Sequence, residues 1–265
     1  MFFQRPSRNL LITLRDAITH TLPPACAGCD GHAPPRRAFC ALCDDVAYPL
    51  QNPLCAVCSV PMEQFSSPDE ARSECSRCRR RPPNFDRIIA HWEYDGAVAD
   101  AIRRLKYGDD FASLRALCRG ARPWFLRCLC ELPEDCPIIP VPSHSTSLRR
   151  RGFHVPTMSL RLLLPRRHRH RIDHRLIKTR STPRQAGLPF AARQANVRDV
   201  FDYRASTTPQ GPAILFDDVV TTGATADAAA GVLLDAGFES IEIVTLARAP
   251  ARRSYQAPPP SPRLP

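Results

Sequence analysis

The chain has 265 residues, 43% of them hydrophobic and 24% charged, with a formal net charge of +11. This is the composition of an ordinary globular protein, and no apolar run approaches the roughly 20 residues that span a bilayer. The sequence therefore excludes a membrane-spanning chain. The first 23 residues contain no continuous apolar stretch of the secretory type, so we expect a cytoplasmic protein.

The N-terminal segment, residues 1–25, carries apolar residues at helical spacing. Leu10, Leu14 and Ile18 recur every four residues ahead of Pro23. This spacing predicts a short amphipathic helix with one apolar face. We expect that face to pack on the segment that follows.

Residues 26–83 contain four successive C-x-x-C pairs. Each pair places two thiolates on one tight turn, and two pairs can converge tetrahedrally on one Zn²⁺. The pattern predicts a double zinc ribbon with two structural zinc ions, rather than a disulfide scaffold or a thioredoxin-like redox motif. The simplest pairing joins the first pair to the second and the third to the fourth, while an interleaved pairing remains open. The eight predicted ligands are Cys26, Cys29, Cys40, Cys43, Cys55, Cys58, Cys75 and Cys78.

Residues 84–250 alternate between strand-like and helix-like patterns, which predicts an α/β domain. Its last part is a βαβ unit, because two apolar strands flank a helical stretch. The proline-rich tail, residues 251–265, has no apolar periodicity and is expected to be disordered. The predicted strands are 87–92, 136–142, 213–216 and 240–246, and the predicted helices include 96–106 and 225–236, with helical patterns on both sides of Pro123.

The chain is strongly basic between residues 143 and 200, where fourteen cations face only Asp173 and Asp199. A segment with this excess needs an anionic partner or ample solvent, and phosphates are the natural candidates. Arg149, Arg150 and Arg151 follow the strand that ends near residue 141, on the side where α/β proteins bind ligands. They can hold a pyrophosphate group, although a solvated surface explains them equally well.

The residues best suited to binding a ligand follow the predicted strand 213–216, where two acids precede a loop of small and hydroxyl-bearing residues. Asp217 and Asp218 can accept hydrogen bonds from vicinal hydroxyls or hold a hydrated Mg²⁺. The loop 221–225 can direct backbone N–H groups, threonine hydroxyls and a helix N-terminus at one phosphate. A sugar that carries a 5′-phosphate suits both parts of this motif, because its hydroxyls match the acid pair and its phosphate matches the loop. The predicted binding residues are Asp217, Asp218, Val219, Thr221, Thr222, Gly223, Ala224 and Thr225.

This run resembles the 5-phosphoribosyl-1-pyrophosphate motif of type I phosphoribosyltransferases. With four C-x-x-C pairs ahead of it, the chain resembles the ComF/GntX family, whose members are associated with natural competence and DNA uptake. The resemblance implies a Rossmann-like phosphoribosyltransferase domain, with the acid pair at the ribose hydroxyls and the loop at the 5′-phosphate. It also implies a mobile catalytic loop that carries Lys178 and Arg180. Where the family continues Gly-Phe-Asn-Gln, this chain has His154 and Val155 after Gly152 and Phe153.

Two functions follow from the sequence. The first is a phosphoribosyltransferase-like protein that binds phosphoribosyl pyrophosphate, or a related sugar phosphate, with Mg²⁺. The second is a single-stranded DNA-binding competence factor whose sugar-phosphate pocket is a sensor or a relic and whose partners include other competence proteins. The intact acid pair and threonine loop favour a pocket that still binds a ligand.

Overall fold

The computed structural model describes residues 24–29, 31–62, 73–107, 110–143, 152–179, 200–205 and 207–250. The N-terminal helix predicted within residues 1–25, the tail 251–265, the arginines 149–151 and Arg180 lie outside this part of the chain, apart from residues 24 and 25. Within the described residues, no helix is both long and apolar enough to cross a membrane.

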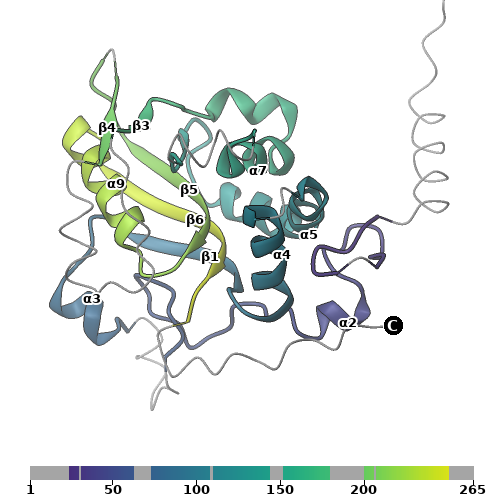
Figure 1. Ribbon diagram of the computed structural model, residues 1–265. Coiled ribbons are helices and arrows are strands. Elements are labelled where there is room, and N and C mark those ends of the chain that lie inside the picture. The colour runs from purple at the N-terminus through teal and green to yellow at the C-terminus, as the bar shows by residue number, and fades with distance from the viewer. Residues whose placement is uncertain are drawn as a thin grey trace, which may run out of the picture.

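The centre of the fold is a four-stranded parallel sheet with the strand order β1-β6-β5-β2 (Figure 1). Its strands are β1 (Arg87–Glu93), β2 (Ile138–Pro140), β5 (Pro212–Val220) and β6 (Ser240–Arg248). Strands β5 and β6 are largely buried, as expected for parallel strands that are covered on both faces. The predicted α/β class is confirmed, and every carboxyl end of the sheet lies at one edge.

Helices cover the two faces of the sheet (Figure 1). One face packs against α4 (Gly96–Tyr107), α5 (Phe111–Cys130) and α7 (Val155–Leu163). The other face packs against α9 (Ala224–Ala236) and the antiparallel pair β3 (Leu176–Lys178) and β4 (Phe201–Tyr203). Alternation along β5 serves both layers, because Ile214 and Phe216 enter the first core and Ala213 and Leu215 the second.

The cysteine-rich segment packs directly on both layers. It contributes two short helices, α2 (Ala41–Asp44) and α3 (Ser76–Arg80). Cys26 and Phe39 belong to the buried cluster that contains α4 and α5, whereas Cys55, Cys58 and Cys78 belong to the cluster that contains α9. Both cores therefore cross the predicted boundary at residue 83.

Two regions differ from the sequence prediction. The helical patterns around Pro123 form one continuous 20-residue helix, α5, because its buried face continues past the proline to Phe125 and Leu129. The basic run Arg166–Arg171 forms a 3₁₀ helix, η2, and its last residue is buried. Arg171 donates hydrogen bonds to the carbonyl oxygens of Cys136 (2.9 Å) and Pro133 (3.3 Å), so this cation supports the fold.

Candidate functional site

The carboxyl end of β5 presents an acid pair at the edge where all four strands end. The strand is buried through Phe216, and Asp218 is only 5% exposed. The Lys106 ammonium, at the end of α4, lies 2.7 Å from Asp218 Oδ2. An ion pair this deeply placed fixes the carboxylate, because a buried charge without a partner is costly.

The pKa values of the two acids are shifted in opposite directions. Burial raises the pKa of Asp217 well above its usual value, and the adjacent charge of Asp218 raises it further. Burial also acts to raise the pKa of Asp218, but the Lys106 ammonium outweighs it and holds that pKa below its usual value. The acid pair therefore titrates as a coupled unit, and the Lys106 ammonium favours placing its negative charge on Asp218.

Both lysines of the chain approach this acid pair, although 35 of its 37 basic residues are arginine. Lys178 ends β3, where burial lowers its pKa and the nearby carboxyl group of Asp217 opposes that shift. A compact ammonium suits a carboxylate that must also face a ligand, because it occupies less of the carboxylate than a guanidinium fork does. The two lysines are therefore a feature of the sequence that points to this site.

The loop after the acid pair leads directly into the N-terminus of α9. Gly223 adopts φ +82°, a left-handed conformation that favours glycine, and it caps the helix. The Thr222 hydroxyl accepts a hydrogen bond from the backbone N–H of Ala224 (3.3 Å). Thr225 lies in the first turn of α9. The free N–H groups of a helix start and its dipole make this loop suited to a phosphate.

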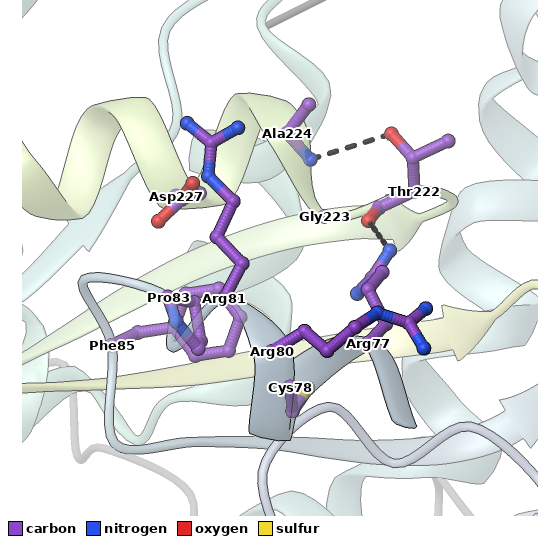
Figure 2. Close-up of a pocket in the computed structure, with 10 residues that line it drawn as sticks. All are labelled: Arg77, Cys78, Arg80, Arg81, Pro83, Phe85, Thr222, Gly223, Ala224 and Asp227. Carbon is purple, nitrogen blue, oxygen red and sulfur yellow. Dashed lines mark hydrogen bonds between the residues drawn. The ribbon is translucent and has the colours of Figure 1, made fainter. Parts of the chain in front are cut away.

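The second cysteine cluster lies beside this loop (Figure 2). Arg77, on α3 between two of the cysteines, donates from Nη1 to the carbonyl oxygen of Thr222 (2.6 Å). Asn84, just after the cluster, donates from its backbone N–H to the Asp227 carboxylate on α9 (2.7 Å). The cysteine-rich segment thus contacts both the loop and the first turns of the helix that follows it.

Arg248, at the end of β6, is 2% exposed and joins the same parts from inside. Its guanidinium donates to the carbonyl oxygens of Cys58 (2.7 Å), Val220 (3.2 Å) and Ala249 (2.8 Å), and also to that of Thr221. A single buried side chain therefore connects a cysteine pair to the start of the candidate phosphate loop. Arg77 and Arg248 were not among the predicted site residues.

The eight cysteines form two separate groups of four. Cys26, Cys29, Cys40 and Cys43 make one group, and Cys55, Cys58, Cys75 and Cys78 the other, with the sulfur atoms of each group within 4.8 Å of one another. The Cys29–Cys40 and Cys58–Cys75 sulfur pairs are each 3.8 Å apart. This matches the edge of a tetrahedron with Zn–S bonds of about 2.3 Å. Sequential pairing and two four-cysteine zinc sites are confirmed.

Backbone N–H groups point at the sulfur atoms of both groups. Cys40 N–H donates to Cys26 Sγ (3.3 Å), and Cys75 N–H donates to Cys55 Sγ (3.2 Å). A hydrogen bond from the Cys58 side chain, with backbone N–H groups, lowers the pKa of Cys55 to about 4. These donors stabilise thiolates, which is the form that binds zinc.

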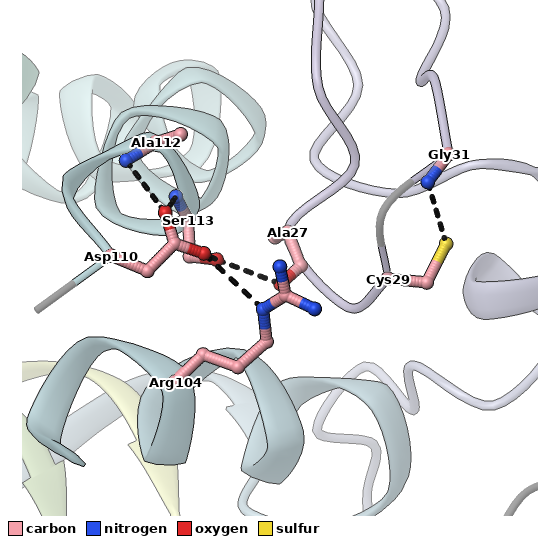
Figure 3. Close-up of polar contacts among 7 residues, drawn as sticks. All are labelled: Ala27, Cys29, Gly31, Arg104, Asp110, Ala112 and Ser113. Atoms are coloured by element: carbon pink, nitrogen blue, oxygen red, sulfur yellow. Dashed lines mark hydrogen bonds and ion pairs between the residues drawn. The ribbon is translucent and has the colours of Figure 1, made fainter. Parts of the chain in front are cut away.

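The first cysteine group is attached to the N-terminal part of α5 (Figure 3). Asp110 caps this helix by accepting from the N–H groups of Ala112 (3.0 Å) and Ser113 (3.2 Å). The Ser113 hydroxyl donates to the carbonyl oxygen of Ala27, which lies between two of the cysteines. The packing is tight here, since a Cβ on Gly120 of α5 would lie 2.6 Å from Ala38 Cβ.

His154 occupies the position at which the sequence departs from the family pattern. Its Nε2 accepts a hydrogen bond from the Ser143 N–H (3.1 Å), and its Nδ1 pairs with the Thr157 hydroxyl (2.8 Å). It is half-buried and precedes α7, so it joins the chain after β2 to that helix. Of the other predicted site residues, Val219 is half-buried on β5 and Thr221 is exposed.

Comparison with known proteins gives matches over both parts of the chain. Residues 17–81 match the family described as a double zinc ribbon domain. Competence protein F of Haemophilus influenzae is 26% identical over 223 residues, which cover 79% of this chain and 96% of that protein. DNA utilization protein YhgH of Escherichia coli K12 is 27% identical over 215 residues, or 79% of this chain and 90% of that protein. The YhgH protein of Salmonella typhimurium is 27% identical over 200 residues, covering 74% and 84% respectively.

The two acids should differ in their effect on stability. Because Asp217 holds its proton more tightly in the folded chain, the free energy of unfolding falls as pH rises from 3.8 toward the raised folded pKa. Asp217→Asn removes that loss, so at pH 7 it should match or exceed the unaltered chain. Asp218→Asn removes the charged partner of Lys106 and should cost about 1–3 kcal/mol. Urea unfolding of both variants measures this, and equal destabilisation by the two would contradict the opposite pKa shifts of the two acids.

The two zinc sites should differ in their effect on the candidate phosphate loop. Elemental analysis should give two zinc ions per chain, and Cys78→Ser and Cys43→Ser should each lose one. Because, among the residues that the structure describes, only the second site contacts the loop, only Cys78→Ser should speed hydrogen exchange at residues 221–225, by about tenfold or more. Cys43→Ser is the matched control. Identical exchange of the loop in the two variants would show that the second ribbon does not hold it.

Proposed function

We propose that this chain, which is related to the competence proteins of the ComF/GntX family, binds phosphoribosyl pyrophosphate with Mg²⁺ and acts in natural competence and DNA uptake. One observation carries the binding proposal: the acid pair Asp217 and Asp218, held by the Lys106 ammonium, stands directly before the loop that opens α9. The names of its relatives, Competence protein F and DNA utilization protein, support the biological setting.

Each part of the site has a chemical task in this proposal. The two carboxyl groups accept hydrogen bonds from the ribose hydroxyls, and the N–H groups and hydroxyls of residues 221–225 hold the 5′-phosphate. Adjacent carboxylates also suit Mg²⁺, which keeps much of its water and binds through one or two carboxylates plus ligand phosphates. We assign the pyrophosphate to Arg149, Arg150 and Arg151, which follow β2 in the sequence.

A transfer reaction would add demands that the binding proposal does not contain. Pyrophosphate leaves as the anomeric carbon becomes electron-deficient, so cations near the leaving group are needed. Lys178 ends β3 and opens the segment that also carries Arg180, and we assign these two cations to that task. A sugar-phosphate sensor would need only the acid pair and the loop.

Calorimetric titration of the zinc-loaded chain tests the binding proposal. Phosphoribosyl pyrophosphate should bind in the presence of Mg²⁺, and Asp217→Asn with Asp218→Asn should abolish binding. Thr222→Val removes one hydrogen bond to a charged group and should weaken binding about ten- to hundredfold. The matched control is Asp235→Asn with Glu239→Gln, which removes two exposed charges elsewhere. Unchanged affinity in the Asp217 and Asp218 double variant would refute the site.

Single-stranded DNA binding is the second candidate function. The relatives' names favour it, and so does the exposure of Arg166, Arg167 and Arg169 on one 3₁₀ helix. Arg171 belongs to the same run in the sequence, but its side chain is committed to backbone carbonyl groups and is left out of the proposed surface. Exposed cations of this kind bind phosphates without sequence preference.

The salt dependence of oligonucleotide affinity tests this second candidate. If about five phosphates are neutralised, log K should fall with log salt at a slope near −3.5. Replacing Arg166, Arg167 and Arg169 with Ser should make that slope shallower by about 2. The control replaces Arg103, Arg115 and Arg127 with Ser, since these exposed cations are spread over α4 and α5. Equal slopes in the two triple variants would exclude η2 as the DNA surface.

A further inference from the structure

A pocket of about 400 Å³ lies between the second zinc ribbon and the start of α9 (Figure 2). The ribbon contributes the side chains of Arg77, Arg80 and Arg81, and the loop contributes Thr222 and Gly223. Neither Asp217 nor Asp218 lines it. The pocket and the acid pair therefore lie beside the same loop without sharing their other residues.

The charges that line this pocket are mainly positive. Its one carboxylate, on Asp227, already accepts hydrogen bonds from the backbone N–H (2.7 Å) and side-chain Nδ2 (3.0 Å) of Asn84. The N-terminus of the 13-residue helix α9 adds its dipole at Ala224. Three guanidinium groups, a helix start and a glycine without a side chain make a chemically consistent anion site.

We propose that this ribbon pocket binds a phosphate monoester, so that the second zinc ribbon supplies cations to a phosphate held at the loop. Arg77 is half-buried and already donates to Thr222, so it positions the loop. Arg80 and Arg81 are exposed at the pocket and are the direct ligands. The phosphate belongs either to a free sugar phosphate or to the phosphorylated 5′ end of a DNA strand. The inference rests on the proposed function only in placing a phosphate at this loop.

The same arginines have a competing explanation. Cys78 also lines the pocket, and a zinc ion with four thiolates carries a net charge of −2. Arginines near it can simply balance that charge. In that case their removal would weaken zinc retention and leave phosphate affinity unchanged in chains that keep their zinc.

Variants of neighbouring arginines on α3 separate these explanations. Arg80→Ala should weaken binding of ribose 5-phosphate about tenfold, and Arg80→Lys should restore part of it. Arg79→Ala is the matched control, because Arg79 lies next to Arg80 on the same helix, is exposed and is not among the lining residues. Arg81→Ala is the second test variant. All variants are titrated by calorimetry, with zinc content measured on each sample.

A second series identifies the source of the phosphate. The probes are phosphoribosyl pyrophosphate with Mg²⁺, a 5′-phosphorylated oligonucleotide and the same oligonucleotide with a 5′-hydroxyl. Dependence on Arg80 only for phosphoribosyl pyrophosphate assigns the sugar phosphate, and dependence only for the phosphorylated oligonucleotide assigns the DNA end. Either result supports the pocket.

The outcomes also separate this inference from the proposed function. If Arg80→Ala and Arg81→Ala bind every probe as Arg79→Ala does, the ribbon pocket is refuted, while Mg²⁺-dependent binding that needs Asp217 and Asp218 would still uphold the sugar-phosphate site. If the phosphorylated oligonucleotide binds through Arg80 and phosphoribosyl pyrophosphate does not bind, the pocket stands and the proposed function fails. Zinc loss from Arg80→Ala, with normal affinity in its zinc-loaded fraction, also overturns the inference.

Discussion

The buried guanidinium of Arg248 is the contact on which the arrangement of the whole site depends. It sits at the carboxyl end of β6 and reaches carbonyl groups from the second ribbon, from the end of β5 and from the loop that follows. Burial lowers its pKa, and the neighbouring side chain of Cys58 opposes that effect. Such a charge is tolerated only where acceptors surround it, because an unpaired buried cation is very costly. The ribbon and the loop supply those acceptors. If either moved away, the Arg248 guanidinium would lose hydrogen-bond partners while it stayed buried.

The zinc ribbons are therefore structural parts of the α/β fold. Cysteines of the first ribbon share a core with α4 and α5, and those of the second share a core with α9 and the sheet. Zinc then has two effects. It holds the two C-x-x-C pairs of each ribbon together, and it fixes the ribbon surface that packs against the α/β core. The ion pair of Lys106 and Asp218 stands at the same edge of the sheet. A few hydrogen bonds therefore join the second zinc ribbon, the sheet and the candidate ligand site.

Local patterns predicted the parts of this molecule that depend on neighbours in sequence. The four C-x-x-C pairs, the buried strand before Asp217 and the helix after Gly223 all follow from short-range spacing and propensity, and the structure confirms the strand and helix assignments and the zinc groups. The contacts of Arg77 with Thr222 and of Arg248 with Cys58 join residues 145 and 190 positions apart. No local pattern distinguishes such arginines among 35. Arg171 shows the same limit, since its place in a basic run gave no sign of burial, and Pro123 was tolerated because the buried face of α5 continues past it.

The long separation between Cys58 and Arg248 also constrains the order in which the chain can be completed during synthesis. N-terminal segments leave the ribosome first, at about 5–20 residues per second. The second ribbon is therefore made well before β5, α9 and β6, the elements that bury it. Until β6 emerges, β1 has no neighbouring strand, and the sheet on which that ribbon packs is incomplete. The second zinc site is therefore synthesised before the last strand against which its segment packs. The nascent chain passes through a stage in which its cysteines can bind zinc but its ligand pocket has not yet formed.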